Sequence, residues 1–155
     1  IDYCNSLLAG CQKHAIDKLQ RIQNSAARLV LRAKKRDHIT PLLYSLHWLP
    51  VKTRIEYKLS VLGHNFFSDS CPVYLSALLS VYSPARNLRS SSDTRTLSIP
   101  RVRTKTFGER AFSFCGPKQW NSLPANIRSI SNTDTFKKTL KTYLFKLYYT
   151  DPVTG

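Results

Sequence analysis

Three cations that alternate with uncharged residues form the spacing in this sequence best suited to binding an anion. Arg101, Arg103 and Lys105 are separated by Val102 and Thr104. In an extended strand this alternation places the three cations on one face, about 6 to 7 Å apart. That separation suits a polyanion such as a nucleic-acid backbone better than a single carboxylate. The alternative is a solvated edge strand whose charges prevent aggregation, and the pattern alone leaves both readings open.

A second set of basic residues lies just before this stretch, in the segment 83–96, SPARNLRSSSDTRT. Its serines and proline predict a loop. Basic loops of this kind commonly become ordered on phosphate, with an affinity that depends on salt. We therefore place the main polyanion footprint here, and it comprises Arg86, Arg89, Arg95 and Arg110 together with the three alternating cations.

A further basic group ends a predicted amphipathic helix near residue 32. These cations would contact phosphates from the polar face of the helix, or they would only form a solvated helix end. The second reading is equally good, because cations also stabilise the negative end of the helix dipole. The group consists of Arg28, Arg32, Lys34, Lys35 and Arg36.

Catalytic constellations are missing from the sequence. The nine acidic residues are scattered, without the D-D or D-x-D pair that two-metal catalysis uses. No glycine-rich phosphate loop, G-x-S-x-G or H-E-x-x-H motif occurs. His14, His38, His47 and His64 lie in separate segments. We therefore predict that this chain is not an enzyme on its own.

The four cysteines also predict no cofactor or metal. The nearest approach to a ligand set is Cys4-x6-Cys11-x2-His14, which lacks a nearby fourth ligand; Cys71 and Cys115 lie far away in the sequence. Buried free thiols in a reducing compartment are the better interpretation.

Composition limits the class of protein and of partner. The 155 residues suffice for one domain with a real core, and 42% of them are hydrophobic. Lys and Arg number 24 against 9 acids, a formal charge of +15. This excess indicates an anionic partner. We expect no membrane segment, because no apolar run is long enough and no signal peptide begins the chain. The absence of methionine predicts a fragment of a longer protein.

Hydrophobic periodicity predicts a mainly helical domain of about five to six helices. A short β-hairpin near 96–114 is the most sheet that we expect. Trp48 is predicted to fill the core between two helices rather than to stack on a base. Gly116-Pro117 is predicted to interrupt the chain before a helical turn that buries Trp120. The predicted helices are about 14–32, with Ile16, Leu19, Ile22, Ala26, Leu29 and Val30 inward; a short one opened by Thr40-Pro41; 51–67; 72–79; and 134–148, capped by Thr133 or Asp134.

An ordered set of sequence blocks spans residues 2 to about 145. Together they resemble the region C-terminal to the palm in reverse transcriptases of non-LTR retrotransposons, the LINE-like (jockey-type) elements. Single blocks are weak, and the specificity lies in their joint order. The blocks are DYCNSLL (2–8), LQRIQN (19–24), AARL (26–29), HITP (38–41), SLHWLPV (45–51), RIEYK (54–58), 86–89, FGERAF (107–112), WNSLP (120–124), FK (136–137) and LKT (140–142).

The resemblance implies a thumb and post-thumb segment that holds template RNA and primer DNA beside a catalytic palm. The palm's Tyr/Phe-Ala-Asp-Asp motif and the endonuclease acids of that family are absent here, so no catalytic residue carries over. The Cys/His knuckle of some relatives is also missing, so no zinc role does either. A truncated genomic copy would explain the missing palm and methionine together.

These observations lead to one expected function and one alternative. We expect a nucleic-acid-binding, non-catalytic segment of a reverse transcriptase, with RNA, DNA and the upstream palm as partners, in a nuclear or cytoplasmic ribonucleoprotein. The alternative is a structural or protein-interaction module with no nucleic-acid role. The expected parts are a helical thumb-like region (1–82), a basic loop or hairpin (83–106) and an aromatic, helical C-terminal segment (107–150).

Overall fold

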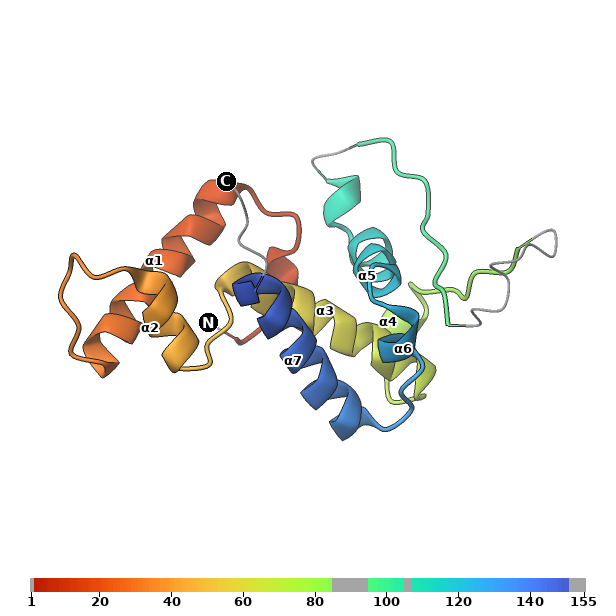
Figure 1. Ribbon diagram of the computed structural model, residues 1–155. Helices are drawn as coiled ribbons and strands as arrows, with labels where there is room; N and C mark the ends of the chain where they lie inside the picture. Colours follow the sequence, from red (N-terminus) through yellow and green to blue (C-terminus); the bar gives the residue numbers. More distant parts are fainter. Residues whose placement is uncertain (1, 85–94, 105–106, 151–155) are drawn as a thin grey trace.

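The computed structural model describes residues 2–84, 95–104 and 107–150, and its fold is mainly helical, as predicted (Figure 1). The described residues form seven α-helices, slightly more than expected, because two of them are single turns of four residues. None of these helices combines the length and apolarity needed to cross a membrane. The elements are η1 (Asn5–Leu8), α1 (Lys13–Val30), α2 (Ile39–Ser45), α3 (Val51–Phe67), α4 (Val73–Ser76), η2 (Gly108–Arg110), α5 (Phe112–Asn121), α6 (Ala125–Arg128) and α7 (Thr133–Thr150).

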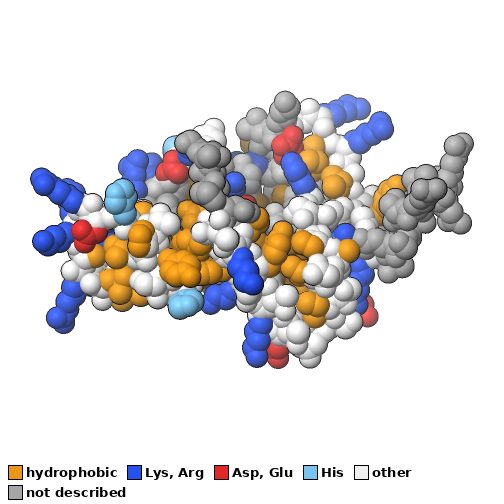
Figure 2. All heavy atoms as spheres, in the orientation of Figure 1, with side chains coloured by type: hydrophobic (Ala, Val, Ile, Leu, Met, Phe, Trp, Pro, Cys, Tyr) orange, Lys and Arg blue, Asp and Glu red, His pale blue; other side chains and the backbone are white. Residues whose placement is uncertain are grey.

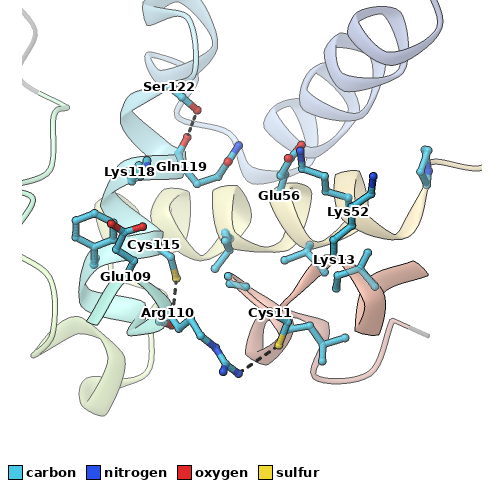
Figure 3. A pocket seen from close by; sticks show the side chains of 18 of the residues that line it. Cys11, Lys13, Lys52, Glu56, Glu109, Arg110, Cys115, Lys118, Gln119 and Ser122 are labelled. Atoms are coloured by element: carbon cyan, nitrogen blue, oxygen red, sulfur yellow. Dashed lines mark hydrogen bonds between the residues drawn. The ribbon is translucent and has the colours of Figure 1, made fainter. Parts of the chain in front are cut away.

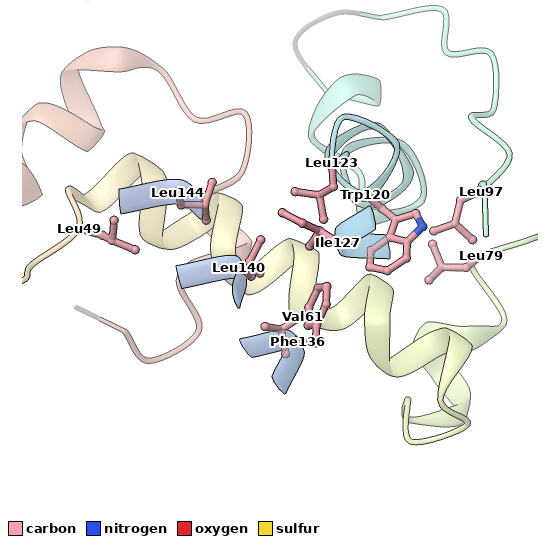
Figure 4. Packing of buried hydrophobic residues seen from close by; sticks show 10 residues of the cluster. All are labelled: Leu49, Val61, Leu79, Leu97, Trp120, Leu123, Ile127, Phe136, Leu140 and Leu144. Carbon is pink, nitrogen blue, oxygen red and sulfur yellow. The ribbon is translucent and has the colours of Figure 1, made fainter. Parts of the chain in front are cut away.

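Helix α3 is the centre of the fold. It packs against η1, α1, α5 and α7, so it separates the α1–α2 pair from α5 and α6 (Figure 1). The main core lies where α3, α5 and α7 meet, and Figure 4 shows side chains converging there from these helices, from α6 and from the connecting segments. The members of this core are Leu49, Val61, Leu79, Leu97, Trp120, Leu123, Ile127, Phe136, Leu140 and Leu144.

The face that α1 turns to the rest of the molecule differs from the prediction. Gln23 and Ala27 are buried, whereas Ile22 and Leu29, predicted inward, are 59% and 81% exposed. The reason is the start of α3, where no side chain of the adjoining Pro50 can cap the helix. The N–H of Val51 donates to Oε1 of Gln20 at 2.9 Å, and Nε2 of Gln23 donates to the Leu49 carbonyl at 2.9 Å. Polar groups of α1 therefore face inward to complete α3.

Helix α5 runs through Gly116 and Pro117, which the sequence predicted to interrupt the chain. Both residues are buried, so the packing of α5 on α3 outweighs the backbone hydrogen bond that proline removes. The two helices approach closely at Gly63, where a β-carbon would lie 2.9 Å from Cε3 of Trp120. Trp120 thus sits directly on the α3 backbone.

Several helix ends also differ from the predictions. Helix α2 begins at Ile39, so Thr40 is not its N-cap. Helix α7 begins at Thr133, and its cap is Asn132, whose Oδ1 accepts from the N–H of Thr135 at 2.9 Å. The helix expected over 72–79 is the single turn α4. At α7, the amide side chain of Asn132 thus caps the helix in place of the expected Thr133 or Asp134.

The hairpin expected near 96–114 does not form within the described residues. Instead, Val81 and Leu97 form an isolated antiparallel bridge. The N–H of Tyr82 donates to the Thr96 carbonyl at 2.8 Å, and the N–H of Ser98 donates to the Ser80 carbonyl at 2.8 Å. This bridge joins the two ends of the basic segment 83–96.

Candidate nucleic-acid interface

The predicted basic residues fall into groups on opposite sides of the core. The turn after α1 lies at one end of the molecule, and residues 97–104 lie at the other (Figure 1). Figure 2 shows Lys and Arg side chains projecting at both ends of the visible face, with hydrophobic side chains between them. A backbone that touched both groups would have to cross the molecule, so we consider each group separately.

The turn after α1, which we call the basic turn, carries four exposed cations: Arg32, Lys34, Lys35 and Arg36. Its backbone is closed by a Schellman motif, in which the N–H of Ala33 donates to the Arg28 carbonyl at 2.9 Å. Asp37 completes the turn by accepting from the backbone N–H of Lys34 at 2.7 Å. The cations are therefore displayed on a defined backbone.

Arg28, the remaining residue of this group, has a more internal position. It is half-buried, and its Nη2 donates to the Asp37 carbonyl at 3.2 Å. Its Nε is buried with no hydrogen-bond partner in the described structure. Arg28 thus braces the basic turn from inside, in addition to any contact that it makes with a phosphate.

The exposed cations of the basic turn form no ion pair with a described carboxylate. Between described residues the structure forms one ion pair, in which Nη1 of Arg54 lies 2.7 Å from Oδ2 of Asp2. No described carboxylate is within 4.0 Å of a charged nitrogen of the basic turn, nor of Arg101 or Arg103. Such charges are free to attract a polyanion, with a strength that falls as salt rises.

Arg32 has a left-handed backbone, with φ of 51°, at the position after the C-cap where glycine is preferred. We expect Arg32→Gly to raise the free energy of unfolding by about 1 kcal/mol, because glycine adopts this conformation without the steric cost of a β-carbon. The same change should weaken nucleic-acid binding, because a cation is lost. Urea unfolding and fluorescence anisotropy would measure the two effects. Lys35→Ala is the control, with equal charge loss and unchanged stability; a destabilised Arg32→Gly would contradict the strain argument.

The second group consists of three arginines. Arg95 is anchored by hydrogen bonds, whereas Arg101 and Arg103 are exposed. Nη1 of Arg95 donates to the carbonyls of Arg128 and Ile130 at 3.0 and 3.1 Å, so its role in the described structure is internal. Arg101 and Arg103 are exposed, while Val102 between them is half-buried beside Gly108. The described part of this stretch contains no strand and Arg103 lies at a bend, so the alignment of the three cations on one face stays a prediction. Arg86, Arg89 and Lys105 lie outside the described residues.

The backbone that leads into this group is held by a clamp of three side chains, Trp120, Asn121 and Arg128. Asn121 both accepts from the Leu97 N–H at 2.9 Å and donates to the Leu97 carbonyl at 2.7 Å, as a neighbouring strand would. Nε1 of Trp120 and Nη1 of Arg128 both donate to the Arg95 carbonyl, at 2.7 and 3.2 Å. Trp120 and Asn121 of the WNSLP block (120–124) thus hold the backbone that precedes Arg101 and Arg103.

Arg128 is the residue of this clamp that the sequence analysis missed. It is 9% exposed, and it also donates to the Leu123 carbonyl at 3.0 Å and to Oγ1 of Thr96 at 3.1 Å. One more arginine in a strongly basic chain carries no sequence signal of burial. Its place directly after the buried Ile127 does not distinguish it from an exposed cation.

Arg110 lines a cleft of about 790 Å³ between η1, α1, α3 and α5 (Figure 3). Its Nη2 donates to Sγ of Cys11 at 3.2 Å. Burial raises the pKa of Glu56 on the cleft wall, although Lys52 opposes this effect, and burial also raises the pKa of the Cys115 thiol. The charges of the cleft are mixed, from Lys13, Lys52, Arg110 and Lys118 to Asp17, Glu56 and Glu109.

The described histidines and cysteines do not converge into a metal-ligand cluster. No group of three His, Cys, Asp or Glu side chains that could hold a metal ion occurs among the described residues. His64 is a core residue: it is fully buried, stacks on Phe136 at 4.2 Å, and places Nε2 3.0 Å from the Ile130 carbonyl. Burial lowers the pKa of His64, and the nearby charges of Arg95 and Lys137 lower it further.

Comparisons with known proteins add no relative: no protein-family model matches this chain, and neither does a curated protein or a solved structure. The resemblance to non-LTR reverse transcriptases therefore remains a prediction from the sequence blocks. The surface itself supports a functional proposal, because it combines unpaired cations with a backbone that holds them in place.

Proposed function

We propose that this chain is a non-catalytic nucleic-acid-binding segment of a non-LTR retrotransposon reverse transcriptase, which holds the backbone of template RNA and primer DNA. The observation that carries the proposal is the basic turn, whose four exposed cations have no carboxylate partner among the described residues. Phosphate contacts of this kind position a nucleic acid without reading its sequence. The polymerase chemistry belongs to a palm elsewhere in the parent protein.

The separation of the two basic groups indicates how the segment would hold its ligand. Residues 97–104 follow the clamp on one side of α3, while the turn after α1 lies on the other side (Figure 1). Contacts at two distant points resist rotation of a bound duplex better than one patch does. The proposed role is therefore to orient the template–primer duplex, rather than only to raise its local concentration.

Salt-dependent binding tests this proposal. We expect a fluorescent RNA–DNA hybrid to bind with an affinity that falls as salt rises. Replacing Arg32, Lys34, Lys35 and Arg36 by alanine should reduce the magnitude of the slope of log K against log salt by about 3.6, since each lost phosphate contact contributes about 0.9. Arg101→Ala with Arg103→Ala should reduce it by about 2.

The matched control removes exposed cations from α7, with Lys138→Ala and Lys146→Ala combined. This variant loses as much charge as the Arg101/Arg103 variant but should retain most of the slope. Binding without a salt slope, or an equal loss in the α7 variant, would refute the proposal. An equal loss in the α7 variant would mean that net charge matters without the predicted surface, and the absence of a slope would mean that phosphate contacts do not drive binding.

The second candidate is a protein-interaction module, and one observation favours it. Ile22, Leu29 and Val30 expose 59%, 81% and 59% of their surface along one face of α1. Contiguous exposed apolar side chains usually mark a contact surface. If the four-cation variant binds nucleic acid unchanged while Leu29→Glu abolishes association with the upstream palm, this candidate replaces the first.

A further inference from the structure

A small pocket lies on the side of the core where the N-terminal segment, the turn between α2 and α3, and helix α7 come together (Figure 1). Its volume is about 480 Å³. It is distinct from the cleft around Arg110 and from both basic groups. The side chains that line it are Asp2, Asn5, His47, Trp48, Leu49, Arg54, Tyr57, Lys58 and Lys141.

Trp48 gives this pocket an aromatic wall held in a defined position. The residue is half-buried, whereas the sequence predicted a core position for it. Its N–H donates to the Leu43 carbonyl at 2.9 Å in a second Schellman motif, and the hydroxyl of Tyr149 donates to its carbonyl at 2.7 Å. His47 before it has a left-handed φ of 53°, a strained conformation for a non-glycine residue. Both hydrogen bonds hold the backbone of Trp48 in place.

The charge of the pocket is positive. The guanidinium of Arg54 lies 6.0 Å from the centroid of the Trp48 ring and is paired with Asp2. Lys58 and Lys141, from α3 and α7, are exposed and have no carboxylate partner among the described residues. An aromatic wall beside unpaired lysines suits a ligand that is both flat and anionic.

Asn5 provides an independent sign of a missing ligand. It is 3% exposed, and its Oδ1 has no hydrogen-bond partner in the described structure. A buried amide oxygen without a donor is unfavourable and uncommon. Because Asn5 lines the pocket, a donor on a ligand there could satisfy its side-chain amide with a small movement.

We propose that this pocket binds a single unpaired nucleotide, which stacks its base on Trp48 and places its phosphate between Lys58 and Lys141. An exocyclic amino group of the base donates to Asn5. The proposal rests on the nucleic-acid role proposed above and makes it specific: the segment captures an unpaired nucleotide of a strand in addition to gripping duplex backbone. A free nucleotide carries the same chemistry, and the experiment separates these two sources.

The test compares three probes on the whole chain: adenosine 5′-monophosphate, a single-stranded oligoadenylate, and a blunt RNA–DNA hybrid. The single strand should quench the fluorescence of Trp48, because a base stacks on it, and Trp48→Phe should remove that quenching. The second tryptophan, Trp120, is fully buried and should not respond. Binding of the monophosphate as tight as that of the single strand identifies a free nucleotide as the ligand; weaker binding identifies the strand.

Lysine variants keep the test independent of folding. Lys58→Ala with Lys141→Ala should weaken single-strand binding by about tenfold, and hybrid binding by much less. Lys138→Ala with Lys146→Ala removes equal charge from exposed positions of α7 outside the pocket. If both pairs weaken single-strand binding equally, while the hybrid still binds with a salt slope, the pocket proposal is overturned and the proposed function stands. If the hybrid does not bind, the proposed function fails first.

Discussion

Trp120→Ala should destabilise the fold by about 3 to 5 kcal/mol, a large part of the stability of a domain of this size. Trp120 has no exposed surface and packs between Phe67 and Phe136, with ring centroids 5.4 and 5.9 Å away. It also rests on the α3 backbone at Gly63. Its removal would leave a cavity at the place where α3, α5 and α7 meet. Urea unfolding, followed by circular dichroism, would measure the loss.

Trp120→Phe serves as the comparison for this prediction. It retains most of the buried ring but loses the Nε1–H that donates to the Arg95 carbonyl at 2.7 Å. We expect a smaller cost of about 1 to 2 kcal/mol, the range for one buried hydrogen bond. An unfolding midpoint of Trp120→Ala equal to that of the native chain would show that this core does not stabilise the molecule.

Arg128→Ala should destabilise the fold by about 2 to 4 kcal/mol, because buried acceptors lose their donor. Its guanidinium donates to the Leu123 carbonyl, the Arg95 carbonyl and Thr96 Oγ1. Since these bonds hold the start of the basic stretch, the change should also weaken hybrid binding, although Arg128 itself is buried. Thermal unfolding and anisotropy at constant salt would measure both effects.

An exposed arginine provides the control for Arg128→Ala. Arg36→Ala removes the same charge from the basic turn and should change stability by less than about 0.5 kcal/mol. It should lower nucleic-acid affinity through the lost charge alone. If the two substitutions had equal effects on stability, Arg128 would be a surface charge rather than part of the clamp.

The fold class and most helix positions were predictable because they depend on local periodicity. Helix α3 has the predicted bounds, and the last helix differs by a residue or two at its ends. The orientation of α1 was not predictable, because Gln20 and Gln23 bind backbone groups that lie far away in sequence. The glutamines supply partners for the Val51 N–H and the Leu49 carbonyl, and the periodicity of α1 does not indicate these partners.

The candidate interface was predictable only in part, for a similar reason. Charge marks a residue as a candidate, but it does not distinguish Arg36, which is exposed, from Arg95 and Arg128, whose guanidinium groups hold backbone carbonyls. The pocket beside Trp48 joins residues from both ends of the chain, so no single stretch of sequence indicates it. Tertiary hydrogen bonding decides which cations face solvent.

The pairing of Ser80 and Tyr82 with Ser98 and Thr96 has a consequence for how this protein can vary. The bridge and the Asn121 amide together keep residues 80–82 next to residues 96–98, independently of the residues that connect them. Doubling the length of a flexible connection costs only about 0.6 kcal/mol of closure entropy. Added length between residues 84 and 95 should therefore cost little folding stability, so a foreign peptide can be grafted there.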